Sequence, residues 1–364
     1  KYYKMAIDKG DSEAMNNYAY MLQYGQGVEV NYEEALKYYK LAIDKGVPTA
    51  MNNYAMMLKN GEGVEVNYEE AAKYFKMAIN KGVPMAMNNY AMMLQEGNGY
   101  LYHHEEIVKY LKMAIDKGIP EAMNNYAMIL EHGIFCNFEE AVKYYKMAID
   151  KGFPIAMYNY ASMLEQGKGV KKDSNEAMKY YKMASDKGYP SAMNSCGIMF
   201  LQGRGVEKNY KEALKYFKMA IDKDEPAAMY HYATMLEEGK GIKANIKEAI
   251  KYYKMAADKG IPNAMYLYAY ILQNGEGVEV NYKDAIKYYK MAADKGFLEA
   301  IYNYALMLQI GQGVEINYEE AVKYHRIAIN GGHKGSMYYY ACLLQKGKGV
   351  ERNSQEAIKY FKMA

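Results

Sequence analysis

Apolar side chains recur along the chain at the spacing of an α-helix, in two kinds of segment that alternate. The first kind is apolar at positions i, i+1, i+4, i+5, i+7 and i+8, as in Ala14, Met15, Tyr18, Ala19, Met21 and Leu22. The second kind carries a similar stripe in Tyr32, Ala35, Tyr38, Tyr39, Ala42 and Ile43, with charged residues on the other side. Stripes of this period predict amphipathic helices, each with one face to bury.

Polar residues, glycine and proline mark where these helices begin and end. Asn31 stands at an N-cap position, and acidic residues follow it in the first turn. Gly46 follows the second helix, where a left-handed residue ends a helix, and Pro48 begins the next one, where its missing N–H costs little. Between the two helices, glycines such as Gly25 and Gly27 predict a tight turn with positive φ.

This helix–turn–helix unit is repeated along the whole chain. Its first segment recurs at intervals of 36 residues, except for one interval of 34. The first segments begin at Ala14, Ala50, Ala86, Ala122, Ala156, Ala192, Ala228, Ala264, Ala300 and Ser336. Because one helix pair is too small to bury its own stripe, about ten such pairs must stack on one another. The predicted fold is an all-α solenoid.

The residues of one unit resemble the Sel1-like repeat family, which is related to the tetratricopeptide repeats. The family pattern reads here Gly61-Glu62-Gly63-Val64, Tyr68-Glu69-Glu70-Ala71, Tyr74-Phe75, Ala78 and Lys81-Gly82. The chain departs from the family at Tyr18-Ala19, where Leu-Gly is usual, and Cys196-Gly197 is the one copy without the tyrosine. The resemblance covers essentially the whole chain. It implies a right-handed α-solenoid whose first helices line a concave surface.

We expect residues 1–364 to form a single repeat array. The first residues, Lys1 to Ala6, align with the last, Lys359 to Ala364, so the chain starts and stops inside a second helix. Repeat arrays normally end in capping repeats with a polar outer face, and neither end carries one. We therefore interpret the chain as a fragment of a longer protein, from which a signal peptide or a fused domain could be missing.

Charge and composition argue against several classes of partner. The 46 Lys and Arg residues nearly balance the 43 Asp and Glu residues, so the net charge is only +3, which argues against a polyanion binder. One repeat position is always lysine: Lys37, Lys73, Lys109, Lys143, Lys179, Lys215, Lys251, Lys287, Lys323 and Lys359. Acidic residues interleave with this lysine ladder, so we interpret it as a solvated outer face and predict no nucleic-acid binding. No apolar stretch reaches the roughly 20 residues of a membrane span.

No constellation of residues points to catalysis or to a metal. Three cysteines, Cys136, Cys196 and Cys342, are too few for a disulfide framework or a cysteine metal site. The histidines show no metal-binding spacing: His103-His104 is interpreted as drift in a surface turn, and His325 as a packing residue at an aromatic position. Phosphate-binding glycine motifs are absent as well. We therefore predict no enzyme activity, no cofactor and no metal.

The face of the first helix opposite its stripe is the predicted partner-binding surface. Counting from Ala14 as offset zero, offsets two, six and nine lie roughly 200°, 240° and 180° around the helix, whereas the stripe centres near 70°. The candidate residues at offset two are Asn16, Asn52, Asn88, Asn124, Tyr158, Asn194, Tyr230, Tyr266, Tyr302 and Tyr338. Those at offset six are Tyr20, Met56, Met92, Met128, Tyr270 and Leu306. We expect offset two to be exposed, and leave open whether offset six is exposed or packs on the adjacent repeat.

These observations favour a non-enzymatic scaffold or adaptor that binds one or more proteins along the concave face. Adaptor roles are also what the family resemblance implies. One alternative is a structural component of a larger cytoskeletal or polymeric assembly. Another, which rests on the resemblance alone, is a regulatory region of a fused kinase. The identity of the partner and the compartment stay open, with the cytoplasm favoured because no disulfide framework is present.

Overall fold

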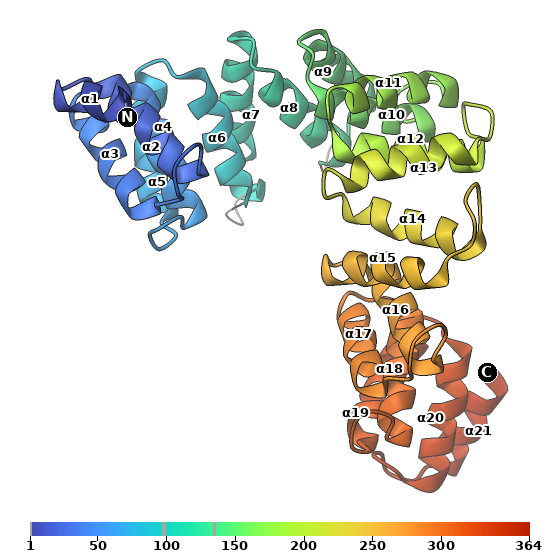
Figure 1. Cartoon of the computed structure of the whole chain (residues 1–364). Helices are drawn as coiled ribbons and strands as arrows, with labels where there is room; N and C mark the ends of the chain where they lie inside the picture. The colour runs from blue at the N-terminus through green and yellow to red at the C-terminus, as the bar shows by residue number, and fades with distance from the viewer. Residues whose placement is uncertain (1, 97–99, 134–135) are drawn as a thin grey trace. The chain divides into compact units, whose positions relative to one another are not determined.

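The computed structural model describes residues 2–96, 100–133 and 136–364 (Figure 1). Within these ranges it contains 21 α-helices and no strand. The chain divides into two compact units, which are treated separately below: unit 1 is Lys1–Asp173 and unit 2 is Ser174–Ala364. Even-numbered helices are the first helices of the repeats, and odd-numbered helices are the second ones, so the predicted all-helical repeat fold is confirmed.

Unit 1 holds the helices α1 to α10. They are α1 (Tyr2–Asp8), α2 (Ser12–Tyr24), α3 (Tyr32–Asp44), α4 (Pro48–Asn60), α5 (Tyr68–Asn80), α6 (Pro84–Leu94), α7 (Tyr100–Asp116), α8 (Pro120–His132), α9 (Phe138–Asp150) and α10 (Pro154–Gln166). Unit 2 holds α11 (Ser174–Asp186), α12 (Pro190–Gln202), α13 (Tyr210–Ile221), α14 (Pro226–Glu238), α15 (Ile246–Asp258), α16 (Pro262–Asn274), α17 (Tyr282–Asp294), α18 (Leu298–Ile310), α19 (Tyr318–Asn330), α20 (Lys334–Lys346) and α21 (Ser354–Met363).

Alanines and tyrosines together form the core between the two helices of a repeat. Ala19 on α2 and Ala35 on α3 are fully buried, and the Tyr39 ring fills the space beside them with no exposed surface. Burial of a ring of this size is worth about 2 kcal/mol. The rings of Tyr18 on α2 and Tyr38 on α3 also pack against each other, edge to face, with their centroids 5.1 Å apart. This contact adds to the packing between the two helices of the repeat. The same edge-to-face pair recurs in most repeats of both units.

The predicted caps and turns are confirmed. The Asn31 side chain accepts the backbone N–H of Glu34 at 3.0 Å, and Gly46 has a φ of 85° just before the helix that Pro48 begins. In most of the described Gly-x-Gly turns, the second glycine also allows close approach of neighbouring repeats. At Gly63, a Cβ atom would lie only 2.5 Å from the Tyr32 Cβ of the preceding repeat. The glycine therefore sets how tightly two repeats stack.

The repeat without the tyrosine replaces it by a different ring. Where other repeats carry Tyr-Ala, unit 2 has Cys196-Gly197, and Phe200 one turn later stacks on Tyr216 at 5.6 Å. Gly197 makes room for this change, because a Cβ atom there would come within 2.6 Å of the Phe217 ring. Cys196 is fully buried, and burial raises the pKa of its thiol to about 12. This repeat keeps the backbone of its neighbours with a rearranged core.

One expectation about the histidines is wrong and another is confirmed. His103 and His104 lie inside α7, which begins at Tyr100, and not in a surface turn. The capping asparagine of other repeats is replaced by His103, and the helix extends back past it. His325 is a buried packing residue, as predicted. The lysine ladder is exposed at all ten positions, as expected for an outer face.

Candidate interaction surface

The asparagines at offset two are buried: Asn16, Asn52, Asn88 and Asn124 in unit 1, and Asn194 in unit 2. The prediction that this position is exposed is therefore wrong for all five asparagines. In unit 1 the reason is that the first helix of the next repeat places an amide against each of them. A role for these asparagines in partner binding stays a prediction.

Nine side-chain amides of unit 1 form one continuous chain of hydrogen bonds across α2, α4, α6, α8 and α10. Between repeats, Nδ2 of an offset-three asparagine donates to Oδ1 of the offset-two asparagine before it, at 2.9–3.1 Å. Within a repeat, the offset-two amide donates to its offset-three neighbour at 3.2–3.4 Å. We call this set the asparagine ladder: Asn16, Asn17, Asn52, Asn53, Asn88, Asn89, Asn124, Asn125 and Asn159. It satisfies the buried amides and holds successive first helices in register.

Unit 2 fills the same positions mainly with rings. At offset two, Tyr230, Tyr266 and Tyr302 are half-buried and Tyr338 is exposed. The Tyr266 ring lies 5.2 Å from Phe297, and the Tyr302 ring stacks on His333 at 4.3 Å. Tyr158, the one offset-two tyrosine of unit 1, is half-buried as well. In unit 2 the first-helix face is therefore partly aromatic and partly open to solvent.

Offset six is nowhere fully buried. Tyr20, Met128 and Tyr270 are 42%, 40% and 41% exposed, and Met56, Met92 and Leu306 are half-buried. The alternative of tight packing on the adjacent repeat is thus excluded for the three most exposed side chains. These apolar groups form a solvent-accessible row on the first helices of each unit.

Offset nine accepts a hydrogen bond from the second helix of the same repeat. The buried hydroxyl of Tyr39 donates to Gln23 at 2.8 Å, that of Tyr289 donates to Gln273 at 3.0 Å, and the ring of His325 takes the same place beside Gln309 at 3.2 Å. Burial lowers the pKa of His325 to about 4, so the ring is neutral at pH 7. Gln23 also donates to Glu62 of the next repeat at 2.7 Å, which links repeats a second time.

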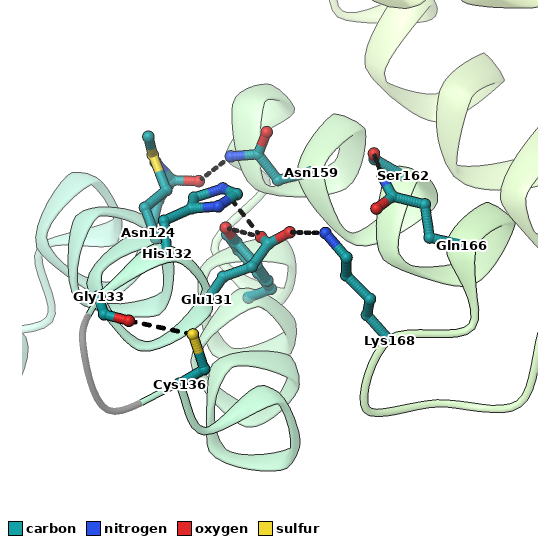
Figure 2. Close-up of polar contacts among 11 residues, drawn as sticks. Asn124, Glu131, His132, Gly133, Cys136, Asn159, Ser162, Gln166 and Lys168 are labelled. Atoms are coloured by element: carbon teal, nitrogen blue, oxygen red, sulfur yellow. Dashed lines mark hydrogen bonds and ion pairs between the residues drawn. The ribbon is translucent and has the colours of Figure 1, made fainter.

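Figure 2 shows the offset-nine residue of α8, Glu131, between the His132 ring and the Lys168 ammonium group. Its carboxylate is buried and accepts a hydrogen bond from the Tyr145 hydroxyl group at 2.9 Å. His132 Nε2 and Lys168 Nζ lie 3.6 Å and 3.9 Å from the carboxylate oxygens. Burial and the negative Glu131 both raise the pKa of Tyr145, so this hydroxyl stays a donor. The site is a satisfied buried carboxylate that joins α8, α9 and the turn after α10.

The repeat unit matches the sequence model of a known family over nearly the whole chain. The Sel1 repeat is found ten times, at residues 12–47, 48–83, 84–119, 120–153, 154–189, 190–225, 226–261, 262–297, 298–333 and 335–364. The chain belongs to the Sel1 repeat family. Sel1 repeats generally build protein-interaction scaffolds, and proteins made of them are typically not catalysts.

Two solved structures share this fold. A protective antigen of uropathogenic Escherichia coli with an SLR fold is 24% identical, with a TM-score of 0.60 over 99% of this chain and 78% of that one. A Sel1 repeat protein from Oxalobacter formigenes is 28% identical, with a TM-score of 0.59 over 67% of this chain and 98% of that one. Among curated proteins, no significant match to this Sel1 chain is found.

The sequence reasoning missed the offset-three half of the ladder in these Sel1 repeats. Asn17, Asn53, Asn89 and Asn125 each follow an offset-two asparagine, so the repeated Asn-Asn pair was the available signal. It also missed the offset-nine pairing. There the signal was that offset nine is Gln or Glu in the repeats whose second helix carries Tyr39, Tyr145 or Tyr289. In the repeat with Phe75, which has no hydroxyl group, offset nine is Lys59.

The described part of the Sel1 array offers neither a cluster of metal ligands nor a membrane span. No group of three or more histidine, cysteine or acidic side chains is placed to hold a metal ion there. No helix among the described residues is long and apolar enough to cross a bilayer. A cavity of about 240 Å³ opens between repeats three and four of unit 1, lined by Gln95, Met128, Ile129, His132 and Gly133.

Proposed function

We propose that the chain is a non-enzymatic scaffold that binds other proteins through the face formed by its first helices, the face predicted to be concave. The observation that carries this proposal is the solvent-accessible apolar row at offset six. Tyr20, Met128 and Tyr270 keep about two fifths of their surface exposed, although each stands on a helix that buries most of its apolar stripe. Apolar side chains repeated on one face of an array are typical of protein-binding surfaces.

Affinity capture with quantitative mass spectrometry tests this proposal. The variant carries Tyr20→Ser, Met128→Ser and Tyr270→Ser on first helices. The matched control carries Tyr32→Ser, Tyr68→Ser and Tyr282→Ser, which begin second helices and are 40%, 46% and 39% exposed. Because the two sets are similarly exposed, both variants lose a similar amount of apolar surface. A difference in binding between them therefore reports which helix face the partner contacts.

The proposal predicts that one or a few proteins disappear from the first-helix variant and are kept by the control, with helicity unchanged by circular dichroism. Recovery of the same proteins from both variants would contradict it. Loss of a polymeric assembly from both variants, through many weak patches, would favour the structural-component alternative instead.

A further inference from the structure

At two junctions, the offset-nine glutamine of one repeat donates a hydrogen bond to the middle residue of the Gly-x-Gly turn in the next repeat. Gln23 Nε2 donates to the Glu62 carboxylate at 2.7 Å. In unit 2, Gln273 Nε2 donates to the Gln312 carbonyl oxygen at 3.0 Å. The glutamine amide is the donor in both cases, so a carboxylate or a carbonyl oxygen occupies the position opposite it.

The junction between the last two repeats of unit 2 has lost this acceptor. Gln309 stands at offset nine of α18, and the turn residue opposite it is Lys348, whose ammonium group only donates. The carbonyl oxygen of Gln309 faces His325 Nε2 at 3.2 Å, so the glutamine offers its NH₂ group to the junction. Lys348 donates instead to the Tyr318 hydroxyl group at 2.9 Å. Among the described residues, no acceptor lies within hydrogen-bond distance of Gln309 Nε2.

A cavity of about 140 Å³ lies at this junction, and we call it the donor cavity. It is lined by Gln309, Tyr318, Cys342, Leu343, Lys346 and Lys348. The polar groups of its wall are mainly donors: an amide, two ammonium groups, and a tyrosine hydroxyl group whose oxygen already accepts from a lysine. Its volume exceeds that of one water molecule several-fold, so a carboxylate on a short carbon chain fits inside.

The positive charge of the donor cavity is not balanced from within the described part of the chain. At the same turn position in other repeats, Lys168 lies 3.9 Å from the Glu131 carboxylate (Figure 2), and Lys240 pairs with Glu238 at 2.6 Å. The two lysines of the donor cavity form no ion pair with any described acidic side chain. Exposed lysines alone hold an anion weakly, but here an amide and a hydroxyl group add directed hydrogen bonds.

We propose that the donor cavity binds a carboxylate group, which takes the position that the Glu62 carboxylate holds beside Gln23 in the first junction. One carboxylate oxygen accepts from the Gln309 NH₂ group, and the other accepts from the Lys346 and Lys348 ammonium groups. Charge-assisted hydrogen bonds of this kind are stronger than bonds between neutral groups. The ligand is an ionised small carboxylic acid or an acidic side chain, since both present the same group. The site does not depend on the proposed scaffold function.

Cys342 lines the donor cavity and allows an affinity-labelling test on the intact chain. Iodoacetate carries the proposed carboxylate group and iodoacetamide is its neutral analogue; each alkylates a thiolate with loss of iodide. Mass spectrometry measures both rates at each cysteine, and their ratio reports recruitment of the carboxylate, since thiol reactivity affects both reagents alike. Exposed Cys136 reports the reagents in the same sample, and alkylation of the fully buried Cys196 reveals unfolding.

Three variants separate the donor cavity from general attraction by positive charge. Lys348→Glu supplies an internal carboxylate opposite Gln309, as in the first junction, and so occupies the site. Lys240→Glu is the matched control, because it makes the same change of charge at the same turn position, opposite Leu201 and not opposite an amide. Gln309→Met removes the amide and leaves both lysines of the cavity in place.

We expect the ratio of the iodoacetate rate to the iodoacetamide rate at Cys342 to fall about fivefold in Lys348→Glu and in Gln309→Met. In Lys240→Glu it should change by less than about twofold. Equal effects of the two lysine substitutions would overturn the proposal. A ratio that survives Gln309→Met would also overturn it, because charge alone would then explain the attraction. If Cys196 is alkylated in Gln309→Met, the two lysine variants decide.

Competition at constant ionic strength identifies the ligand class. Glutarate and a glutamate-containing tripeptide with both ends blocked should each lower the rate ratio at Cys342 in a saturable way. The stronger of the two competitors shows whether a free carboxylic acid or an acidic side chain is the better source of the group. Protection by inorganic phosphate that equals protection by glutarate would overturn the assignment to a carboxylate, as would the absence of saturation.

Discussion

The first helices occupy the same place in the repeat in both units, but the contacts between successive first helices within unit 1 differ in kind from those within unit 2. In unit 1, offsets two and three are asparagines whose amides bond from one repeat to the next. In unit 2, the equivalent positions include Tyr230, His231, Tyr266 and Leu267, and the junctions are made by ring and aliphatic contacts. The helix-pair backbone is therefore compatible with two unrelated ways of joining neighbours.

The two kinds of junction differ in how much stability is expected to be lost when one of their side chains is replaced. Hydrogen bonds depend on distance and direction, and each inner ladder amide bonds to two others, so the loss of one side chain leaves two polar groups without partners. Ring packing is less directional, so it accepts Tyr, His or Leu at the same position. Unit 1 repeats its Asn-Asn pair four times, whereas unit 2 varies at the corresponding positions.

Among the substitutions that compare the two units, Asn88→Ala is expected to lower the free energy of unfolding most. The substitution removes the acceptor of Asn125 and the donor to Asn89 at the centre of the ladder. We expect the free energy of unfolding to fall by about 2 to 3 kcal/mol, measured by urea denaturation. The matched change Tyr230→Phe keeps the ring at offset two of unit 2 and should cost less than about 0.5 kcal/mol. Equal costs for the two substitutions would remove the distinction between the junctions.

Acid should weaken unit 2 through two histidines, the half-buried His231 and the fully buried His325. Burial lowers the pKa of His231 and of His325 to about 4 from 6.5, so the folded state disfavours the proton. Stability is therefore complete above pH 6.5 and is lost as the pH falls from there toward 4, by about 2 kcal/mol at pH 5 for His325 alone. His325→Tyr restores the aromatic pairing with Gln309 seen for Tyr289 and Gln273. Its unfolding midpoint should change less between pH 7 and pH 5, and an unchanged pH dependence would contradict this account.

A smaller difference is expected at offset nine. Tyr145→Phe in unit 1 removes a donor to the buried Glu131 carboxylate, and should cost about 1.5 kcal/mol. Tyr289→Phe in unit 2 removes a donor to the neutral Gln273 amide, and should cost about 1 kcal/mol. Thermal unfolding of both variants measures the difference. A larger cost at Tyr289 would show that the charge of Glu131 does not strengthen its bond.

The smallest effect is expected on the lysine ladder, where the units should not differ. Lys143 lies over the Tyr144 ring at 5.9 Å, and Lys287 lies over the Tyr288 ring at 5.7 Å. Both lysines are exposed, so replacing either by alanine should change the free energy of unfolding by less than about 0.5 kcal/mol. A large loss at one lysine only would mean that the outer faces of the two units differ after all.

Helical period, caps and turn glycines predicted the repeat from the sequence because each depends on residues a few positions apart. Asn31, Gly46 and Pro48 act within one turn of the helix ends that they mark. The interaction surface was harder to predict, because burial at offset two depends on the neighbouring repeat. Helix geometry places Asn52 away from the stripe of its own helix, and only the stacked structure brings the Asn89 amide against it.

The stretch around Cys196 shows the same limit. Its sequence lacks the tyrosine of the repeat, and local pattern alone does not reveal what fills the space. In the structure, Phe200 takes over the stacking on the second helix and Gly197 accommodates Phe217. Both contacts join residues on different helices, so they become visible only when the helices are packed.

A double-mutant cycle on Asn52 and Asn89 tests most directly whether amide bonds join the repeats of unit 1. Each residue is replaced by alanine singly and together, and the coupling is taken from the urea unfolding free energies. The matched cycle uses Tyr230 and Leu267, which hold the equivalent offsets in unit 2. The account predicts a coupling of about 1 kcal/mol or more that favours the Asn52–Asn89 pair, and a smaller one for Tyr230 and Leu267. A coupling near zero between Asn52 and Asn89 would contradict the asparagine ladder as the device that holds these repeats in register.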